Sequence, residues 1–400
     1  MTILRRREFL RAAAAVAASQ IVAAPGLALA PASGDKRFVV VLLRGGMDGL
    51  AAIAPYGDLT YNRMRGSLAL DPPGRNGGLL RLDDQFGLHP GLSSLWKPFK
   101  SGDLLPIHAV GVARSRSHFR SQDILELGTA NSKNTLDGWL NRLLQYQDHY
   151  DAGSAVAISR TVPKILRGSA AVGTLSSQIL PAAETHFVQA VQAIYREDTL
   201  FGPALLQGVR LRAEMDRLQM VNPLVPGRRW NFAQSAAVAG ALLSSPIGPR
   251  IAVLQSGGWD THGGQGTVGG RIGNLFAGLN GAMINLRTAL AGAWDQSVVL
   301  IVSEFGRTIS PNGSAGTDHG SGGLFLAYGG AVNGGNVLTD WPGLTGRASR
   351  NGADLRPTIE ARAIFKGVLQ SHLKVDGNAL DEFIFPNSRT IRPLTNLIRS

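Results

Sequence analysis

The chain has no cysteine among its 400 residues, and aromatic residues make up only 6% of it. The absence of cysteine excludes disulfides and thiolate zinc sites, so any bound metal must be held by nitrogen and oxygen ligands. The 40 Lys and Arg residues form no dense basic run after residue 32. A dedicated nucleic-acid surface combines clustered cations with interleaved aromatic residues, so no nucleic-acid partner is predicted.

Long hydrophobic runs are also missing. No apolar stretch reaches the roughly 20 residues that a membrane-spanning helix needs, so no stable membrane span is expected. The net charge is +12, a balance that attracts phosphates, sulfates, anionic polymers or a membrane surface without choosing among them. A content of 44% hydrophobic and 17% charged residues is typical of a globular protein with a sizeable core.

The first 32 residues have the pattern of an export signal. Arg5–Arg11 is followed by an Ala/Val-rich stretch over 12–24 and by small residues near Ala30 and Ala32. The order Arg6-Arg7-x-Phe9-Leu10-Arg11 resembles a twin-arginine signal; the alternative is an N-terminal amphipathic helix. We expect a signal peptide over 1–32, handled by the twin-arginine translocase, and a single domain over 33–400 in the periplasm or secreted medium. Removal of residues 1–32 takes away four Arg and one Glu, which lowers the net charge of the chain from +12 to +9.

Short apolar runs alternate with helical patterns along the rest of the chain, which predicts an α/β/α sandwich with a mostly parallel central sheet. The expected strands are Phe38–Leu43, Leu104–Val112, Ser154–Ile158, Ile251–Leu254, Ser297–Val302 and Leu324–Tyr328. The expected helices are Gly91–Phe99, Phe119–Leu127, Asp137–Gln145, His186–Tyr195, Leu205–Met220, Asn231–Leu243, Arg271–Ala291 and Thr358–Leu373. In such sheets ligands bind beyond the carboxyl ends of the strands, so the residues that follow the strands matter most.

Acidic and histidine side chains follow several of these strands in glycine-rich loops. They are Asp48, Asp260 with His262, Glu304, and Asp318 with His319. If the strands are neighbours, these groups gather at one edge of the sheet, where clustered carboxylates require either raised pKa values or a cation. Oxygen and nitrogen ligands without thiolates suit a divalent metal such as zinc, manganese or calcium. Each residue alone also fits a turn or helix cap, so it is the coincidence that predicts a metal site.

Three further residues are candidates for catalysis. Ser117 and His118 open an expected helix, where a hydroxyl could attack a phosphate or sulfate because the helix amides stabilise negative charge; Ser117 could equally be a simple helix cap. His118 would then act as a ligand or a general acid. Arg307 lies three residues after Glu304, where it could pair locally with that carboxylate or bind an oxyanion.

The order of motifs resembles an uncharacterised bacterial family, the domain of unknown function 1501. The motifs are Arg44-Gly-Gly-Met-Asp48-Gly-Leu, Leu88-His89-Pro90, Arg116-Ser117-His118-Phe119, Gly138-Trp139-Leu140, Gly257-Gly-Trp-Asp260-Thr-His262, Ser303-Glu304-Phe-Gly-Arg307-Thr and Asp318-His319. This family is similar to the alkaline phosphatase and sulfatase-like superfamily, whose members carry a one- or two-metal site at the carboxyl ends of the strands.

The resemblance implies roles for particular residues. It places Asp48, Asp260, His262 and His319 at metal-ligand positions, and Ser117 or His118 near the nucleophile position. Glu304-Phe305 stands where the superfamily commonly has Asp-His or Asp-Asn, so a second metal would lack a donor. Two hypotheses follow: an exported metal-dependent hydrolase of a small or polymeric phosphate or sulfate ester, or a non-catalytic exported protein of the same fold that binds an anionic glycan or an assembly partner.

Overall fold

The computed structural model describes most of the chain after the expected signal. The described residues are 36–112, 115–129, 135–146, 154–176, 184–198, 230–345, 349–350 and 353–399, with residues 202, 205, 209 and 213. The expected signal peptide and most of the helix expected over 205–220 lie outside them. Within the described part, no helix combines the length and the hydropathy needed to cross a membrane.

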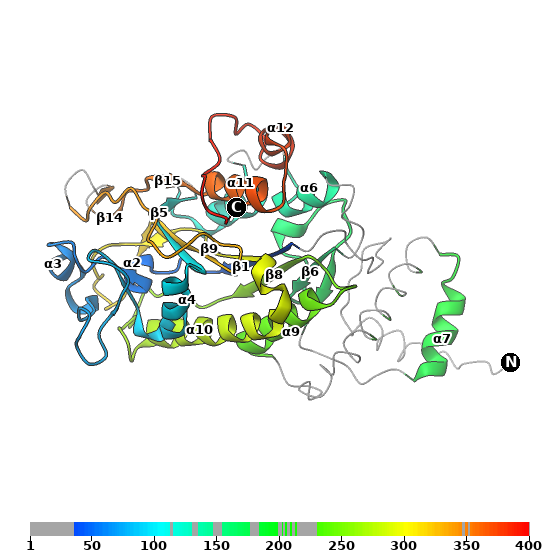
Figure 1. Ribbon diagram of the computed structural model, residues 1–400, viewed down its shortest axis with the longest axis horizontal. Helices are drawn as coiled ribbons and strands as arrows, with labels where there is room; N and C mark the ends of the chain where they lie inside the picture. The colour runs from blue at the N-terminus through cyan, green and yellow to red at the C-terminus, as the bar shows by residue number, and fades with distance from the viewer. Residues whose placement is uncertain are drawn as a thin grey trace.

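An eight-stranded sheet runs through the centre of the molecule (Figure 1). Its strands, in spatial order, are β15 (Ile359–Glu360), β5 (Leu104–Gly111), β12 (Gly323–Tyr328), β9 (Ser297–Ser303), β1 (Arg37–Leu43), β8 (Ile251–Ser256), β6 (Ala155–Ile158) and β7 (Gly173–Leu175). Every neighbouring pair is parallel except the two made by β12, which is antiparallel to β5 and to β9. The predicted mostly parallel sheet is therefore confirmed.

Helices cover both faces of this sheet. The main ones are α4 (Trp96–Ser101), α5 (His118–Leu127), α6 (Trp139–Tyr146), α9 (Phe232–Ser244), α10 (Arg271–Leu290) and α11 (Ala361–His372). Helix α7 (Thr185–Ile194) lies apart from the sheet (Figure 1). Shorter ones are α2 (Gly49–Ala52), α3 (Tyr61–Arg65), α12 (Gly377–Ala379), the 3-10 segments η1 (Gly66–Leu68), η2 (Pro90–Leu95), η4 (Lys164–Leu166) and η5 (Ala291–Gln296), and the π-helical η7 (Leu380–Ile384). Figure 1 shows α9 and α10 on one side of the sheet and α6 and α11 on the other.

The central strand β1 explains this sandwich, because both of its faces are buried. Val39, Val41 and Leu43 pack into the core formed with α9 and α10. Phe38, Val40 and Leu42 pack into the core formed with α5, α6 and α11. A strand buried on both sides needs apolar residues at every position, which is why the run is continuous rather than alternating. The predicted α/β/α arrangement is confirmed.

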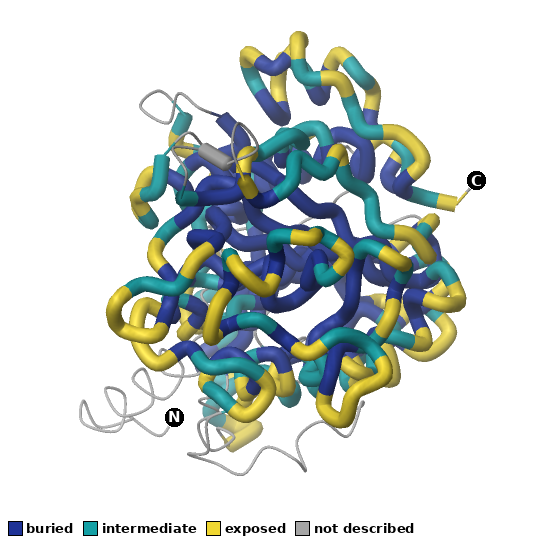
Figure 2. The backbone as a smooth tube through the Cα atoms, turned by 90° about the vertical axis from the view of Figure 1, so that its left-hand side faces the viewer, coloured by how far each residue is buried: buried dark blue, intermediate teal, exposed yellow. Residues whose placement is uncertain are grey.

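Three small sheets lie outside the main one. They are β2 (Ile53–Ala54), β4 (Gly87–Leu88) and β3 (Leu80–Arg81); β10 (Gly306–Arg307) with β11 (His319–Gly320); and β13 (Ser349–Arg350) with β14 (Asp354–Leu355). Figure 2 shows the buried strands at the centre of the molecule and the exposed turns around them. The β10–β11 pair joins the two ends of the loop that follows β9.

Candidate metal centre

The carboxyl ends of β1, β8 and β9 lie side by side. Leu43 in β1 is in register with Ser256 in β8 and with Ser303 in β9. The loops that follow these parallel strands therefore start at the same edge of the sheet, as predicted, and they carry Asp260 and Glu304 there.

Two shorter elements bring histidines to this edge. The antiparallel pairing of β10 with β11 sets His319 opposite Arg307. Helix α5, which follows β5, begins at His118. The two imidazoles meet edge to face, with ring centroids 4.4 Å apart.

His118, Asp260 and His319 form the candidate metal site. One ligand atom from each lies within 4.8 Å of the others, and all three side chains are partly exposed. Nε2 of His118 lies 3.3 Å from Oδ2 of Asp260, and Nε2 of His319 lies 3.2 Å from Oδ1. Together the two imidazoles and the carboxylate could hold one divalent ion.

The second nitrogen of each histidine is fixed by an acceptor. Nδ1 of His319 lies 2.7 Å from the carbonyl oxygen of Arg116, and Nδ1 of His118 lies 2.9 Å from Oε1 of Glu304. A carbonyl or carboxylate oxygen only accepts, so each neutral ring can hold its proton on Nδ1 toward this outer acceptor, which leaves Nε2 free to bind a metal beside Asp260. This arrangement of an outer acceptor behind each histidine is typical of metal sites.

His262 stands at the side of this group. Its Nδ1 lies 3.0 Å from Oδ1 of Asp318, and its Nε2 lies 3.1 Å from Oδ1 of Asp260. The same Nε2 is 3.0 Å from Nε2 of His319. With its proton on Nδ1 toward Asp318, His262 would present a third imidazole lone pair to a metal at this place.

Three imidazole lone pairs and a carboxylate that face one another repel unless a proton or a cation lies among them. The donor set fits a divalent transition metal, since imidazole and carboxylate are preferred ligands of zinc. The chemistry of the residues present is therefore compatible with the metal that the sequence predicts.

The carboxylates of the site are held in their ionised forms. Burial alone would raise the pKa of Asp260, but the hydrogen bond and charge of Arg307, with smaller effects of His262 and His319, lower it. The hydrogen bond from Asn312 is the main cause of the lowered pKa of Asp318. Ionised carboxylates are the forms that bind a metal.

His319 is held in its neutral form. Burial lowers the pKa of His319, and the nearby His118 lowers it further. The Arg116 carbonyl and Asp260 act in the opposite direction without reversing the shift. A neutral imidazole is the form that binds a metal.

Glu304 lies behind the site rather than in it. Its side chain is buried, and its Oε1 accepts hydrogen bonds from the Gly45 amide at 2.8 Å, from His118, and from Gln122 at 3.0 Å. Burial would raise the pKa of Glu304, but these hydrogen bonds, led by that of Gln122, lower it. Glu304 is placed to orient His118.

Phe305 forms a wall of the site. Its buried ring packs on His118 and on His319, with centroids 4.8 Å and 4.5 Å apart. The position where the resemblance implies a second donor is thus filled by an apolar ring that supports both imidazoles.

Asp48 is not among the three clustered residues. Its Oδ1 accepts hydrogen bonds from the amides of Leu50 and Ala51, so it caps α2. Its Oδ2 accepts from Arg65 and from Gln265, both at 2.6 Å. Both oxygens of this fully buried carboxylate are therefore engaged by protein groups.

The two remaining candidates differ in exposure. Arg307 is buried and donates to Asp260, to the Gly45 carbonyl and to Thr317. Ser117 is exposed, and it occupies the cap position of α5 without a side-chain cap hydrogen bond. Ser117 directly precedes His118 in the chain.

Sequence reasoning missed the residues that support the site from behind. Arg65, Gln265, Thr317 and Asn312 bond to the predicted residues, but none of them follows a strand or forms a recognisable motif. Gln265 stands within a run of glycines, where a lone amide side chain was the available signal.

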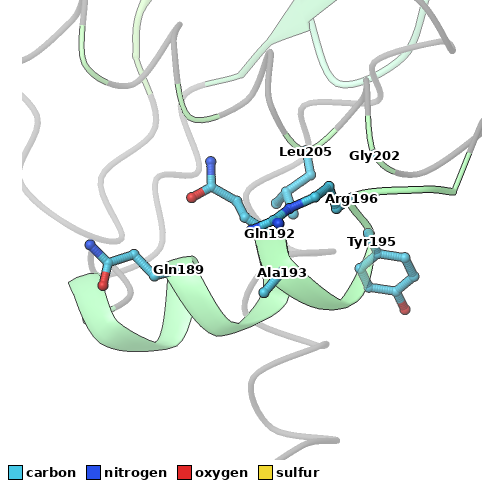
Figure 3. Close-up of a pocket in the computed structure, with 7 residues that line it drawn as sticks. All are labelled: Gln189, Gln192, Ala193, Tyr195, Arg196, Gly202 and Leu205. Atoms are coloured by element: carbon cyan, nitrogen blue, oxygen red, sulfur yellow. The ribbon is translucent and has the colours of Figure 1, made fainter.

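Two other features are separate from this cluster. His108 is a buried core residue, with Nε2 3.1 Å from the Ile53 carbonyl oxygen. A pocket lies along α7, lined by residues such as Gln189, Gln192 and Arg196 (Figure 3). This pocket contains none of the acidic or histidine candidates.

The fold and the site together define an α/β/α protein with a histidine–carboxylate cluster at the carboxyl edge of its sheet. Residues 113–382 match the family described as "Protein of unknown function (DUF1501)". The chain therefore belongs to the DUF1501 family, as its motifs predict.

Comparisons with individual proteins add a similarity to solved structures. No curated protein matches the chain by sequence. Among solved structures, the chain is similar to the crystal structure of the C-terminal periplasmic domain of EcEptC from Escherichia coli, in complex with Zn. The identity is 9% and the TM-score 0.33, with 74% of each chain covered.

Proposed function

We propose that this protein is an exported hydrolase of phosphate or sulfate esters that depends on one divalent metal ion. The ion is held by His118, Asp260 and His319, with His262 beside them. The observation that carries the proposal is the convergence of three imidazole Nε2 atoms on one carboxylate, with an outer acceptor at the Nδ1 atom of each ring.

A divalent ion at this place supplies a Lewis acid for an ester oxygen. The chain supplies the remaining parts. Ser117 lies at the start of α5, where free helix amides favour an anion, so its hydroxyl or a water molecule is the nucleophile. The nucleophile oxygen bonds to phosphorus or sulfur as the ester P–O or S–O bond breaks, and Nε2 of His262, whose Nδ1 is held by Asp318, takes the nucleophile's proton and passes it to the leaving alcohol oxygen. With Ser117 as the nucleophile, a water molecule then releases the phosphate or sulfate from the serine by the same proton exchange.

One metal rather than two is proposed, because Phe305 is apolar and Glu304 is engaged with His118, Gln122 and Gly45. We further propose that the protein works in the periplasm or outside the cell, because residues 1–32 have the pattern of a twin-arginine signal. Zinc is the preferred ion for two or three imidazoles with one carboxylate.

Elemental analysis of the purified protein, followed by a screen of phosphate and sulfate monoesters and diesters, tests the proposal. We expect about one zinc per chain and ester hydrolysis that Asp260→Asn and His319→Gln abolish. His186→Gln is the matched control, because His186 is exposed and its side chain pairs with Glu184 outside the site. Hydrolysis that persists in Asp260→Asn contradicts the proposal.

Ser117→Ala separates the two nucleophiles. Loss of at least about 100-fold in kcat with zinc retained identifies the hydroxyl as the nucleophile, and an unchanged kcat identifies water. The alternative function, a non-catalytic protein that binds an anionic glycan or an assembly partner, is favoured by the full engagement of Arg307 with protein groups. Zinc binding without hydrolysis of any ester class would support that alternative.

A further inference from the structure

We propose that Arg307 is a positioning residue that fixes the Asp260 carboxylate, and that a buried line of hydrogen bonds from Asp48 fixes Arg307 in turn. The proposal rests on the ion site of the proposed function. It assigns to Arg307 and Asp48 roles that differ from the anion contact and the metal ligand expected from the sequence.

The contacts of Arg307 all point into the protein. One terminal nitrogen donates to Oδ1 of Asp260 at 2.6 Å and to the Gly45 carbonyl at 3.2 Å. Nε donates to Oγ1 of Thr317 at 3.1 Å, and the other terminal nitrogen donates to the Thr317 carbonyl. A buried guanidinium engaged on every nitrogen is poorly placed to take up a substrate oxyanion.

This arrangement makes the two oxygens of Asp260 different. Oδ1 receives the Arg307 hydrogen bond, whereas Oδ2 lies 3.3 Å from Nε2 of His118. Arg307 thus turns the carboxylate so that Oδ2 is presented on the His118 side.

Arg307 takes its direction from Thr317 and Gln265. Oε1 of Gln265 accepts hydrogen bonds from the hydroxyls of Thr261 and Thr317, both at 2.7 Å. The Thr317 hydroxyl donates its one hydrogen to Gln265, so its oxygen can only accept the hydrogen bond from Nε of Arg307. The direction of the hydrogen bond from Thr317 to Gln265 therefore determines the direction of the bond from Arg307 to Thr317.

Asp48 sets the polarity of the whole line. An ionised carboxylate only accepts, so it selects the amide nitrogen of Gln265, which lies 2.6 Å from Oδ2, and turns Oε1 toward the threonines. Arg65 pairs with the same Oδ2 at 2.6 Å, and both side chains of this ion pair are fully buried.

Stability is a poor explanation for this line. A buried ion pair contributes little more to stability than apolar residues of the same volume, because both charges must be desolvated. The line of hydrogen bonds instead holds the Asp260 carboxylate in one orientation. Removing residues that hydrogen-bond to metal ligands in this way changes the affinity for the metal.

The test measures zinc affinity of the full protein by competition with a chromophoric chelator. Thr317→Val and Gln265→Met remove links that cannot be ligands, and we expect each to weaken zinc binding about 10-fold. Thr317→Ser keeps the hydroxyl and should bind like the wild type. Lys366→Met is the destabilised control, because Lys366 is buried and bonds only to Asp381, Ser388 and Ile391 among the described residues.

A double-mutant cycle distinguishes an effect of Thr317 that passes through Arg307 from a general loss of stability of the protein. In an Arg307→Met background, Thr317→Val should produce no further loss of zinc affinity, because its effect passes through Arg307. Additive losses, or wild-type affinity in both Thr317→Val and Gln265→Met, overturn the proposal. A wild-type protein that binds no zinc overturns both this proposal and the proposed function, whereas zinc binding with a non-additive cycle but no ester hydrolysis overturns the proposed function alone.

Discussion

His262 and His319 face each other nitrogen to nitrogen, with their Nε2 atoms 3.0 Å apart. Both Nδ1 atoms are held by acceptors, Asp318 for His262 and the Arg116 carbonyl for His319. With the ring protons on Nδ1, the two Nε2 atoms would turn their lone pairs toward a shared cation, whereas a proton on one of them makes the contact a hydrogen bond. The contact therefore places two nitrogens that can bind a metal next to each other at this edge of the sheet.

This contact predicts unequal effects of substituting the two rings. His319→Gln removes a member of the three-ligand group and should lower zinc affinity by at least about 100-fold. His262→Gln should lower zinc affinity by about 10-fold, because the His262 side chain is 45% exposed and lies beside the three-ligand group. Isothermal titration with zinc measures both, and equal losses would show that the two histidines are equivalent ligands.

Gly45 is predicted to be irreplaceable where β1 ends. Its φ is +124°, and an added Cβ would lie 2.4 Å from the backbone nitrogen of Asp260. Gly45→Ala should therefore lower the free energy of unfolding by at least about 2 kcal/mol and weaken zinc binding, because the Asp260 backbone must move. Urea denaturation and zinc titration measure the two effects.

Gly257→Ala is the matched control for Gly45→Ala. Gly257 belongs to the same loop as Asp260, but an added Cβ meets nothing within 4 Å. We expect its stability to change by less than about 0.5 kcal/mol and its zinc affinity to stay at the wild-type value. A Gly45→Ala protein as stable as Gly257→Ala would refute the steric argument.

Lys366 should anchor the segment that follows α11. Its buried ammonium donates to Asp381, to the Ser388 carbonyl at 2.7 Å and to the Ile391 carbonyl at 2.9 Å. Lys366→Met leaves these acceptors without a donor and should cost about 2–4 kcal/mol in the free energy of unfolding. Arg389→Met, which breaks the exposed pair with Glu382, should cost less than about 1 kcal/mol in the same urea experiment.

Stability should fall between pH 6.5 and about 4. Burial lowers the pKa of His89, His108 and His372 from 6.5 to about 4. In this window the unfolded chain binds protons that the folded chain does not, so stability decreases as the pH falls, by up to about 3 kcal/mol per histidine. Above pH 6.5 these groups contribute no slope.

Urea denaturation at several pH values measures this slope. His372→Gln can keep a donor toward the Arg37 carbonyl, which lies 3.0 Å from Nε2 of His372, while it removes the titrating ring. The variant should therefore show a shallower slope between pH 6.5 and 4 than the wild type. An identical slope would mean that His372 is protonated in the folded protein.

The sheet and its helices could largely be predicted from the sequence. Continuous apolar runs identify strands buried on both faces, and β1 and β9 match the predicted runs to within one residue at either end. The antiparallel direction of β12 could not be read from its run, because burial on both faces looks the same whichever way a strand points.

The sequence indicated which residues lie near the candidate site better than it indicated how their side chains are oriented. Asp260, His262, Glu304 and His319 meet at one edge because they follow neighbouring strands or return to them. Asp48 follows such a strand too, yet its partner Gln265 is 217 positions away in the chain, and only the folded structure shows that pairing. Spacing along the sequence gives no information on which way a carboxylate turns.

The reversed direction of β12 has a consequence for how this protein can diversify. Since β12 begins at the edge where β9 ends, the segment over 304–322 leaves the sheet and re-enters it at the same place. Such a loop can lengthen, shorten or change its outer residues while both of its ends stay anchored. The surface beside the candidate site can therefore vary among relatives without changes to the sheet beneath it.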